Sequence, residues 1–543
     1  MNLIPTAQAW LDQDPDPETR SELQKLISNN ELAALEARFS SRLEFGTAGL
    51  RGELGAGPNR MNRVLVAQTA LAIANFLKRN QSEYLDTTGS LSVVIGFDGR
   101  VNSDVFALDS AKIIAGAGIK VSLFDSPVPT PVAAFTGRGL RSSATIVVTA
   151  SHNPPKDNGY KVFLGGATGG SQLVPPQDSE IANEINHVAA KLKFPEIPKS
   201  DDFQIIGQHE IDTYVKRAAE LIPAEDSRRK DLRITYTAMH GVGHRVVKGI
   251  LDLTGFDFQS VPKQQEPDGS FPTVAFPNPE EKGAMDLSFE TASEFGSDLI
   301  LANDPDADRL AVGIKSTDGF RMLTGDEVGL ILADRMATLG KATVIANSLV
   351  SLDMSALAKH YGLEYQQTLT GFKWISKVPN LSYGYEEALG YCVDPEFTPD
   401  KDGITAALMI ADLASELKAS GSDLAEYLVE LAGRYGHQKT GQVSIRVTDL
   451  GIIKNIMATV RQSPPIDLLG EACKSEDLAL GVNFPATDGM ILESRNARVV
   501  IRPSGTEPKL KCYLQYTGPS ELVAQEKLNE LSSWASELLE NLS

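Results

Sequence analysis

Short apolar runs alternate along the chain with longer amphipathic stretches. The runs Leu91–Phe97 and Ala144–Thr149 are apolar enough for buried strands, and Ser103–Ile119 between them is expected to be a helix. Such alternation is typical of α/β domains built on parallel sheets. Three later runs continue the pattern as expected strands: Arg233–Tyr236, Asp298–Leu301 and Thr343–Ala346.

The last part of the chain has a different pattern. The strand-like segments Gln442–Val447, Arg498–Ile501 and Lys509–Tyr516 lie among helical segments there. We therefore expect the chain to end in an α+β domain rather than in another doubly wound one.

Proline, charge and polar turns mark the candidate boundaries between domains. Lys191–Asp202 is rich in proline and charge and is suited to a linker, and Lys315–Arg321 is a polar turn between two strand-like runs. Ser420–Asp423 and Gly433–Thr440 bracket a third candidate break. At about 150 residues per domain, the length of 543 residues predicts three or four domains.

Composition excludes several classes of protein. The 51 Lys and Arg against 71 Asp and Glu give a net charge of −20, which disfavours nucleic acid as a partner. The hydrophobic fraction of 42% is enough for several cores. No apolar run approaches the ~18 residues of a membrane span, so we expect no membrane partner.

Cysteine usage and the N-terminal sequence bear on the compartment. Cys392, Cys473 and Cys512 are the only cysteines of the sequence and lie far apart. This pattern excludes a disulfide framework and a cysteine-built zinc site, and it fits a reducing compartment. The first residues lack the basic start and apolar run of a signal peptide, so we expect a cytoplasmic protein.

A serine follows one of the expected strands. Ser151 comes two residues after Thr149, on a turn stiffened by Pro154 and Pro155, and is placed like a nucleophile at a strand end. A cap or simple turn serine is the commoner role for this pattern. The neighbouring His152 predicts a poor Ser-His dyad, because adjacent residues of an extended segment point to opposite sides.

Three aspartates alternate directly after another expected strand. Asp304, Asp306 and Asp308 offer oxygen ligands that suit Mg²⁺ or Ca²⁺. An EF-hand is excluded, because Arg309 and Lys315 stand where that loop needs glycine and glutamate. A haloacid-dehalogenase-type phosphatase would have threonine or valine in place of Asp308. A solvated acidic turn is disfavoured by the apolar runs on both sides, so we expect a divalent metal site.

Two further loops have residue types that suit sugar phosphates. Arg502 follows a strand-like run and precedes two hydroxyls and a glycine, which together could cradle an anion or form a proline-bounded surface turn. Glu386 and Glu387 could accept hydrogen bonds from polyol hydroxyls or could be ordinary solvated acids. Lys373, in another polar turn, could meet an anion.

Taken in order, these loops resemble those of the α-D-phosphohexomutase superfamily, which includes phosphoglucomutase and phosphomannomutase. The resemblance rests on TASHNP at Ser151, DPDADR at Asp304, GYEEALG at Glu386 and RPSGTEPK at Arg502. It extends to FGTAGLRG at residues 45–52 and TAMHGVG at residues 237–243. PNPEEKGAM at residues 277–285 and TGFKWI near Lys373 are similar to the branch with phosphopentomutase-like and bacterial phosphoglucomutase enzymes.

The resemblance implies an α/β fold of four domains around a central cleft. Three related α/β units with mixed sheets would precede a smaller C-terminal α+β domain. We expect these domains to span residues 1–205 with a phosphoserine, 206–318 with the metal, 319–432 with the sugar site, and 433–543 with a phosphate site.

The resemblance also implies a role for each loop. The expected catalytic residues are Ser151, His152, Lys161, Arg51, Arg309 and Lys373. Mg²⁺ would be held by Asp304, Asp306, Asp308 and an oxygen of phosphorylated Ser151. The expected sugar-binding residues are Glu386, Glu387, Gly371 and Phe372, and the expected phosphate-binding residues are Arg502, Ser504, Gly505, Thr506 and Lys509.

Several residues are candidates for the general base that takes the proton of the attacking hydroxyl. His152, Lys161 and, for a flipped substrate, Lys373 could each be the base, and a lysine base would need a lowered pKa. Arg51 is expected to steady the phosphoserine. For Arg100, a structural ion pair with Asp98 and a catalytic role are equally favoured.

The implied reaction moves a phosphate between C1 and C6 of a hexose through a phosphoserine and a bisphosphate, with glucose 1-phosphate as first choice of substrate. Glucose 1,6-bisphosphate or a related sugar bisphosphate would be the activator. A phosphopentomutase acting on ribose or deoxyribose 1-phosphate and a phosphomannomutase are the alternatives, because Ala388 stands where relatives often have a serine that touches the sugar.

Besides a phosphosugar mutase, two other classes of protein are considered. A Mg²⁺-dependent sugar phosphatase would use Asp304 or Ser151 as nucleophile and release phosphate to water. A non-catalytic sugar-phosphate-binding protein is disfavoured by the intact serine, aspartates and Arg502. The expected partner is a small phosphosugar, and the chain is expected to be a monomer or a homodimer.

Overall fold

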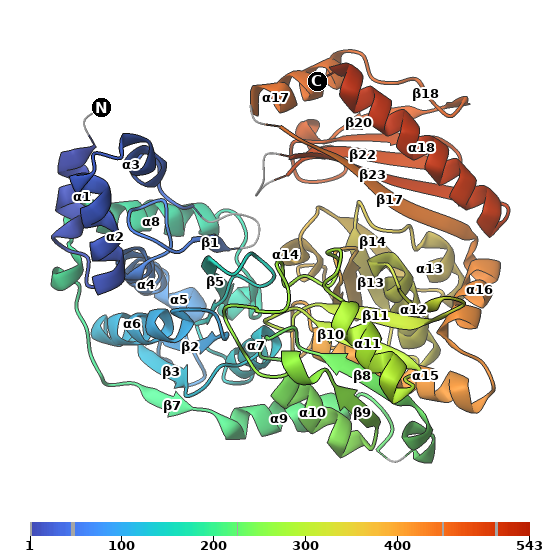
Figure 1. Cartoon of the computed structure of the whole chain (residues 1–543), viewed down its shortest axis with the longest axis horizontal. Helices are drawn as coiled ribbons and strands as arrows, with labels where there is room; N and C mark the ends of the chain where they lie inside the picture. The colour runs from blue at the N-terminus through green and yellow to red at the C-terminus, as the bar shows by residue number, and fades with distance from the viewer. Residues whose placement is uncertain (1–2, 45–48, 225, 448–449, 505–508, 543) are drawn as a thin grey trace. The chain divides into compact units, whose positions relative to one another are not determined.

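The computed structural model describes residues 3–44, 49–224, 226–447, 450–504 and 509–542. The chain folds into two compact units, each built from sheets and helices (Figure 1). The first unit consists of residues Met1–Leu323 and Leu389–Ser420. The second consists of Thr324–Ala388 and Gly421–Ser543. The polypeptide therefore leaves the first unit and returns to it once.

The first sheet of the first unit is mixed. Its strand order is β1-β5-β4-β2-β3-β7, with β6 paired to β5, and the strands β4, β2, β3 and β7 run parallel. The strands are β1 (Leu50–Glu53), β2 (Ser92–Phe97), β3 (Lys120–Phe124), β4 (Ala144–Val148), β5 (Asp157–Leu164), β6 (Ser171–Gln172) and β7 (Gln204–Ile206). Its helices are α4 (Arg63–Arg79), α5 (Gln81–Tyr84), α6 (Ser103–Gly116), α7 (Thr130–Gly139) and α8 (Gln177–Lys191).

Helices cover both faces of this sheet. Ile95 and Ile146 point into one core together with residues of α4, α6 and α8. A Cβ built on Gly96, the next residue along β2, would lie 2.9 Å from Ala133 of α7. Because successive strand residues point to opposite faces, α7 covers the other side. The strands are therefore buried on both faces, which explains their continuous apolar sequence.

The second sheet of the first unit is also mixed, in the order β12-β11-β10-β8-β9. Strand β10 runs parallel to β8 and antiparallel to β11. The strands are β8 (Arg233–Thr237), β9 (Asp257–Ser260), β10 (Leu299–Asn303), β11 (Leu310–Ser316) and β12 (Gly319–Met322). Its helices are α9 (Gln208–Ala219), α10 (His244–Thr254) and α11 (Asp286–Phe295).

The returning segment Leu389–Ser420 completes the first unit. It contains β16 (Gly390–Cys392) and the almost wholly buried helix α15 (Gly403–Ala419). Asp412 of α15 pairs with the buried Arg229 at 3.1 Å, and Asp402 accepts hydrogen bonds from Tyr214 at 2.8 Å. Because these partners are buried, the segment is an integral part of this unit.

The second unit begins with a sheet in which β14, β13 and β15 lie side by side and run parallel. These strands are β13 (Val344–Ser348), β14 (Glu364–Thr368) and β15 (Tyr383–Glu386). The helices of this part are α12 (Gly325–Thr338), α13 (Ser355–Tyr361), α14 (Phe372–Ile375) and α16 (Leu424–Tyr435).

The C-terminal part of the second unit is an antiparallel sheet in the order β17-β23-β22-β21-β20. Helix α18 (Glu521–Leu542) packs along β17 and β23 (Figure 1). The other elements are β17 (His437–Arg446), α17 (Leu450–Gln462), β18 (Asp467–Leu468), β19 (Glu471–Ala472), β20 (Lys474–Asp477), β21 (Met490–Glu493), β22 (Ala497–Pro503) and β23 (Lys509–Gly518). This arrangement agrees with the α+β pattern expected for the end of the chain.

Three helices precede the first sheet: α1 (Ile4–Leu11), α2 (Pro17–Ser28) and α3 (Leu32–Phe39). Trp10 and Phe39 contribute to the core of the first unit and contact each other edge to face. None of the helices in the described ranges combines the length and apolarity needed to cross a membrane.

Most of the expected strands start or end within two residues of those observed. Helix α6 ends at Gly116 rather than at Ile119, because Gly118 turns the chain with a φ of 80°. The predicted linker Lys191–Asp202 leads into β7, which adds an edge strand to the first sheet. The domain boundaries expected from sequence remain a prediction.

Candidate functional site

Ser151 lies on a left-handed turn at the end of β4. Its φ is 52°, and its backbone N–H donates to Thr149 Oγ1 at 2.8 Å. Its hydroxyl donates to Asp304 Oδ2 at 2.6 Å. A left-handed conformation is unfavourable for a residue with a Cβ, and it persists only where surrounding contacts impose it. The loop Thr149–Asp157, which we call the serine loop, therefore holds this hydroxyl beside an aspartate far away in sequence.

His152 contacts the same hydroxyl. Its Nδ1 lies 3.1 Å from Ser151 Oγ. The expectation that adjacent residues would point apart was wrong, because Ser151 has left-handed rather than extended backbone geometry. Burial, together with the positive charges of Arg309 and Arg51, holds the pKa of His152 well below its usual value. The imidazole is therefore neutral near physiological pH, and it lies within hydrogen-bond distance of the Ser151 hydroxyl.

Asp304, Asp306 and Asp308 form a buried acidic cluster on the loop Asp304–Arg309, which we call the metal loop. One carboxylate oxygen from each lies within 4.8 Å of the others. In the described part of the chain, Asp306 Oδ1 and Asp308 Oδ1 are buried without a hydrogen-bond partner. Buried carboxylate oxygens require a cation or a donor, so this cluster fits a hard divalent cation.

The protonation of the cluster is uneven. Burial and the charges of the other two aspartates raise the pKa of Asp304. Burial is the largest influence on Asp306 and Asp308 and disfavours their charged forms. Lys161, together with Thr130 at Asp306 and with Lys401 and Arg309 at Asp308, outweighs burial and lowers the pKa of both carboxyls. Two acids of the cluster are therefore held ionised beside a fixed cation, as a metal ligand must be.

Lys161 extends from β5 into the acidic cluster. Its Nζ lies 2.5 Å from Asp306 Oδ2 and 2.5 Å from Asp308 Oδ2, and the side chain is 2% exposed. Although burial opposes the charge, the two carboxylates raise the pKa of Lys161. A general base needs the opposite shift, so Lys161 is placed here as a cation and not as a neutral amine.

Two arginines flank these groups. Arg51 lies on β1 opposite Gly159 of β5, and its Nη1 donates to Asn153 Oδ1 of the serine loop at 3.1 Å. The backbone N–H of Arg309 donates to Asp304 Oδ1 at 3.0 Å. The first unit thus brings together five of the six expected catalytic residues and all four expected metal ligands, with Ser151 counted in both sets. Phe45, Gly46, Thr47 and Ala48 of the motif that contains Arg51 lie outside the described residues.

The predicted sugar-binding residues belong to the second unit. Glu386 ends β15 and is buried, while Glu387 accepts a hydrogen bond from Ser351 Oγ at 2.8 Å. Burial and the neighbouring Glu386 raise the pKa of Glu387 to about 7. A Cβ built on Gly325, at the start of α12, would lie 1.8 Å from the carbonyl oxygen of Glu387, so this close approach requires glycine.

The other predicted residues of the second unit lie on α14 and between β22 and β23. Gly371 precedes α14 with a φ of 111°, and Phe372 and Lys373 are buried in its first turn. The main-chain N–H of Ser504 donates to the carbonyl of Lys509 at 2.8 Å. Gly505 and Thr506 lie outside the described residues.

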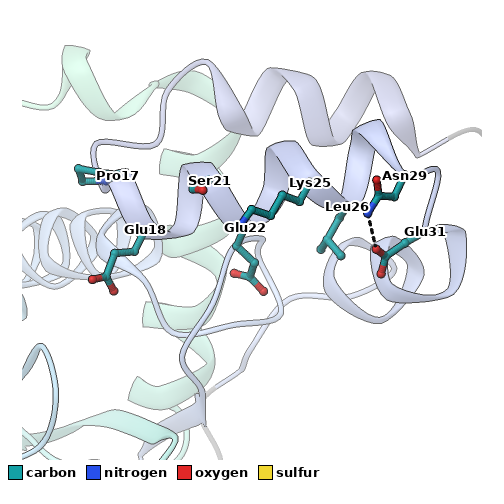
Figure 2. Close-up of a pocket in the computed structure, with 8 residues that line it drawn as sticks. All are labelled: Pro17, Glu18, Ser21, Glu22, Lys25, Leu26, Asn29 and Glu31. Carbon is teal, nitrogen blue, oxygen red and sulfur yellow. Dashed lines mark hydrogen bonds between the residues drawn. The ribbon is translucent and has the colours of Figure 1, made fainter.

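A separate concave surface lies on α2. Figure 2 shows its lining residues, which are Pro17, Glu18, Ser21, Glu22, Lys25, Leu26, Asn29 and Glu31. Asn29 donates to Glu31 at 3.1 Å, and Glu22 pairs with Arg38 and accepts from the N–H of Ala56. Glu22, Asn29 and Glu31 are thus engaged with each other or with the rest of the protein, and none of the predicted site residues lies on this surface.

Comparison with known families accounts for most of the chain. The description "Phosphoglucomutase/phosphomannomutase" matches it in four parts: alpha/beta/alpha domain I at residues 42–191, domain II at 212–317, domain III at 324–434 and the C-terminal domain at 486–531. The chain belongs to the phosphoglucomutase/phosphomannomutase family. Its members are phosphomutases, which are isomerases that transfer phosphate within a substrate. The predicted fold, three related α/β domains and a smaller C-terminal domain, is confirmed.

Individual relatives of this family carry different names. The chain is 43% identical to the "Probable phosphomannomutase" of Haemophilus influenzae, with 88% of this chain and 98% of that protein covered. It is 32% identical to human phosphopentomutase, with 97% and 94% covered. It is also 32% identical to the phosphoglucomutase of Staphylococcus haemolyticus, with 91% and 94% covered.

Among solved structures, parafusin from Paramecium has a TM-score of 0.72 at 16% identity, with 92% of this chain and 96% of that chain covered. This likeness concerns the fold alone. The names of the relatives agree on a phosphomutase and differ in the sugar.

Sequence reasoning missed two side chains that contact the acidic cluster of this phosphomutase. Thr130 of α7 donates to Asp306 Oδ2 at 2.5 Å, and its backbone N–H donates to the carbonyl of the same residue at 2.9 Å. Lys401, in the returning segment, has its Nζ 3.4 Å from Asp308 Oδ2. The polar run Asp400–Asp402 directly before the apolar helix α15 was a signal that could have drawn attention to Lys401.

Proposed function

We propose that this protein interconverts glucose 1-phosphate and glucose 6-phosphate, and that Ser151 carries the phosphoryl group between the two positions. The observation that supports this most is the placement of Ser151 Oγ, 2.6 Å from Asp304 and 3.1 Å from His152 on a left-handed turn. A cap or turn serine would not need contacts to a buried acidic cluster on another domain.

Each half-reaction exchanges one P–O bond for another. A sugar hydroxyl attacks the phosphorus on Ser151, a new sugar O–P bond forms, and the P–Oγ bond of the phosphoserine breaks. The proton of the attacking hydroxyl passes to a base, and the departing Oγ gains a proton. The resulting bisphosphate then returns its other phosphate to Ser151, so that no phosphate is released to water and the net change is an isomerisation.

The residues around Ser151 suit these steps. The imidazole of His152 lies 3.1 Å from Ser151 Oγ and is therefore placed to exchange a proton with that oxygen through Nδ1. Lys161, Arg51 and Arg309 supply positive charge for a phosphoryl group, whose transfer needs positioning and charge stabilisation above all. We infer that Asp304, Asp306 and Asp308 hold Mg²⁺, which would polarise the transferring group.

Loops of the second unit are assigned the binding of the sugar and of the phosphate that does not react. Glu386 and Glu387, with Gly371 and Phe372, would bind the sugar, and Lys373 would assist when the substrate is flipped. The phosphate that is not reacting would be bound by Arg502, Ser504, Gly505, Thr506 and Lys509. Arginine suits this role because it can bind phosphate with two parallel hydrogen bonds.

The sugar is the part of the proposal that the relatives leave open. Glucose phosphate is our first choice, ribose or deoxyribose phosphate the second and mannose phosphate the third. Initial rates on the 1-phosphates of these sugars, measured with Mg²⁺ and a catalytic amount of the matching bisphosphate, decide among them. A higher rate on a pentose phosphate would overturn the choice of glucose and leave the mutase class intact.

Intact-mass analysis tests the covalent step. Wild-type protein treated with glucose 1,6-bisphosphate should gain one phosphoryl group, and peptide mapping should place it on Ser151. Ser151→Ala should lose the adduct and the turnover, while Ser126→Ala, at a half-buried serine between β3 and α7, should keep both. Steady release of inorganic phosphate would indicate a phosphatase instead, and brisk isomerisation by Ser151→Ala would contradict the proposal.

A further inference from the structure

The backbone of Ser151 is held from both sides. On its N-terminal side, Thr149 Oγ1 accepts the N–H of Ser151 and donates to Asp98 Oδ2 at 2.6 Å. On its C-terminal side, the carbonyl of Ser151 accepts a hydrogen bond from Arg100 Nη2 at 2.5 Å. The hydrogen bonds on the two sides of Ser151 therefore connect it to Asp98 and to Arg100, which follow the end of β2.

Arg100 makes most of its contacts with the serine loop. Nη2 also donates to the carbonyl of Asn153 at 2.6 Å, and Nη1 donates to the carbonyls of Pro154 and Asp157 at 2.9 and 3.0 Å. One planar guanidinium thus serves four carbonyls of a single loop. Since its donors have a rigid geometry, these four bonds define the path of the loop more strictly than a flexible ammonium would.

An ion pair with Asp98 does not account for this arrangement. Arg100 Nε lies 3.4 Å from Asp98 Oδ2, whereas that carboxylate accepts shorter bonds from Ser103 Oγ at 2.7 Å and from Thr149 Oγ1. The Arg100 side chain is 1% exposed and stacks 5.0 Å from the ring centre of Phe271. The Arg100 side chain is thus buried beneath the serine loop, and it contacts the backbone of that loop.

We propose that Arg100 is a positioning residue that imposes the left-handed turn at Ser151 and so aims its hydroxyl for phosphoryl transfer. This inference rests on the proposed role of Ser151 as phosphoryl carrier. Without the guanidinium, four buried carbonyls would lose their donors and the strained turn could relax. Because a displacement of about 1 Å at a reacting atom costs on the order of 100-fold in rate, the loss should fall on turnover rather than on substrate binding.

Arg229 provides a matched control. It is fully buried, donates to the carbonyls of Thr254 and Pro223, pairs with Asp412 and stacks on Phe256, so its surroundings resemble those of Arg100. It touches neither the serine loop nor the metal loop. Arg229→Met should therefore lose stability to a similar degree without a specific effect on phosphoryl transfer.

The experiment compares Arg100→Lys, Arg100→Met and Arg229→Met with wild type. Thermal unfolding reports folding, calorimetry reports the affinity for glucose 1-phosphate, and time-resolved intact mass reports phosphorylation of Ser151 by glucose 1,6-bisphosphate. We expect both Arg100 variants to lose about 100-fold in phosphorylation rate and in kcat, with affinity within about threefold of wild type. We expect Arg229→Met to keep kcat within about threefold.

Any of three results would overturn the inference. The first is an Arg100→Lys enzyme with near wild-type phosphorylation and turnover, and the second is an equal loss of kcat in Arg229→Met. The third is failure of both Arg100 variants to fold while Arg229→Met folds, which would indicate a role in the fold as a whole. If wild-type protein itself takes no phosphate on Ser151, the proposed function fails, and this outcome is distinct from a failure at Arg100.

Discussion

Replacing Lys161 by methionine should make the stability of the first unit depend on a divalent cation. The Lys161 ammonium lies 2.5 Å from both Asp306 and Asp308, and all three side chains are at most 2% exposed. Removing one partner of a buried ion pair costs about 3–5 kcal/mol, because the remaining charges are left uncompensated. A Mg²⁺ ion bound by the same carboxylates would compensate them instead. At a concentration of about 100 times its Kd it would restore ~2.7 kcal/mol.

Thermal unfolding of Lys161→Met and wild type, each with EDTA and with Mg²⁺, measures this effect. We expect a fall of several degrees in the Tm of the first unit in EDTA, and recovery of most of it in Mg²⁺. Lys418→Met, which removes a more exposed pair with Asp298, is the control and should shift little in either condition. If the Tm of Lys161→Met lies equally far below that of wild type with and without Mg²⁺, the lysine and the cation do not compensate the same charges.

Three further predictions concern other contacts of the site. Thr130→Val removes the hydrogen bond to Asp306 and should weaken Mg²⁺ binding about tenfold in a calorimetric titration. Thr130→Ser keeps the hydroxyl and should bind Mg²⁺ as wild type does. Equal Mg²⁺ affinities of Thr130→Val and wild type would show that this contact does not orient Asp306. Arg502→Ala should raise KM for the phosphosugar by at least about tenfold with kcat little changed, and an unchanged KM would place the phosphate site elsewhere. Glu387 has a pKa raised from 4.5 to about 7 by burial, so its contribution to stability is present below 4.5 and is lost as the pH rises through 7. Glu387→Gln should therefore raise the Tm relative to wild type at about pH 8 but not at about pH 5, and a gain independent of pH would contradict this assignment.

The strands and the acidic cluster could be predicted from the sequence for a simple physical reason. β4 and β10 are buried on both faces and therefore appear as continuous apolar runs, and the polar residues that follow them must lie at the sheet edge. The alternation of Asp304, Asp306 and Asp308 is a local pattern, so it could be recognised without knowing the fold.

The contacts that complete the site could not be predicted in this way. The meeting of Ser151 and His152 depends on a left-handed φ, which leaves no trace in a hydrophobic pattern. Thr130 reaches Asp306 across 176 residues of sequence, and a pattern of neighbouring residues carries no information about such a contact. The raised pKa of Lys161 likewise depends on two carboxylates supplied by a different sheet.

The return of Leu389–Ser420 to the first unit has a consequence for synthesis of the protein. Strands β10 and β11 leave the ribosome long before α15, the helix that packs against them. Until Ser420 has emerged, Arg229 has no Asp412 to pair with, and Tyr214 has no Asp402. At ~5–20 residues per second, about 5–20 seconds pass between the synthesis of Leu323 and that of Ser420, and this core stays open during that time. A gene truncated after Leu323 would leave it open permanently, so any fragment intended to represent the first unit must carry residues 389–420 as well.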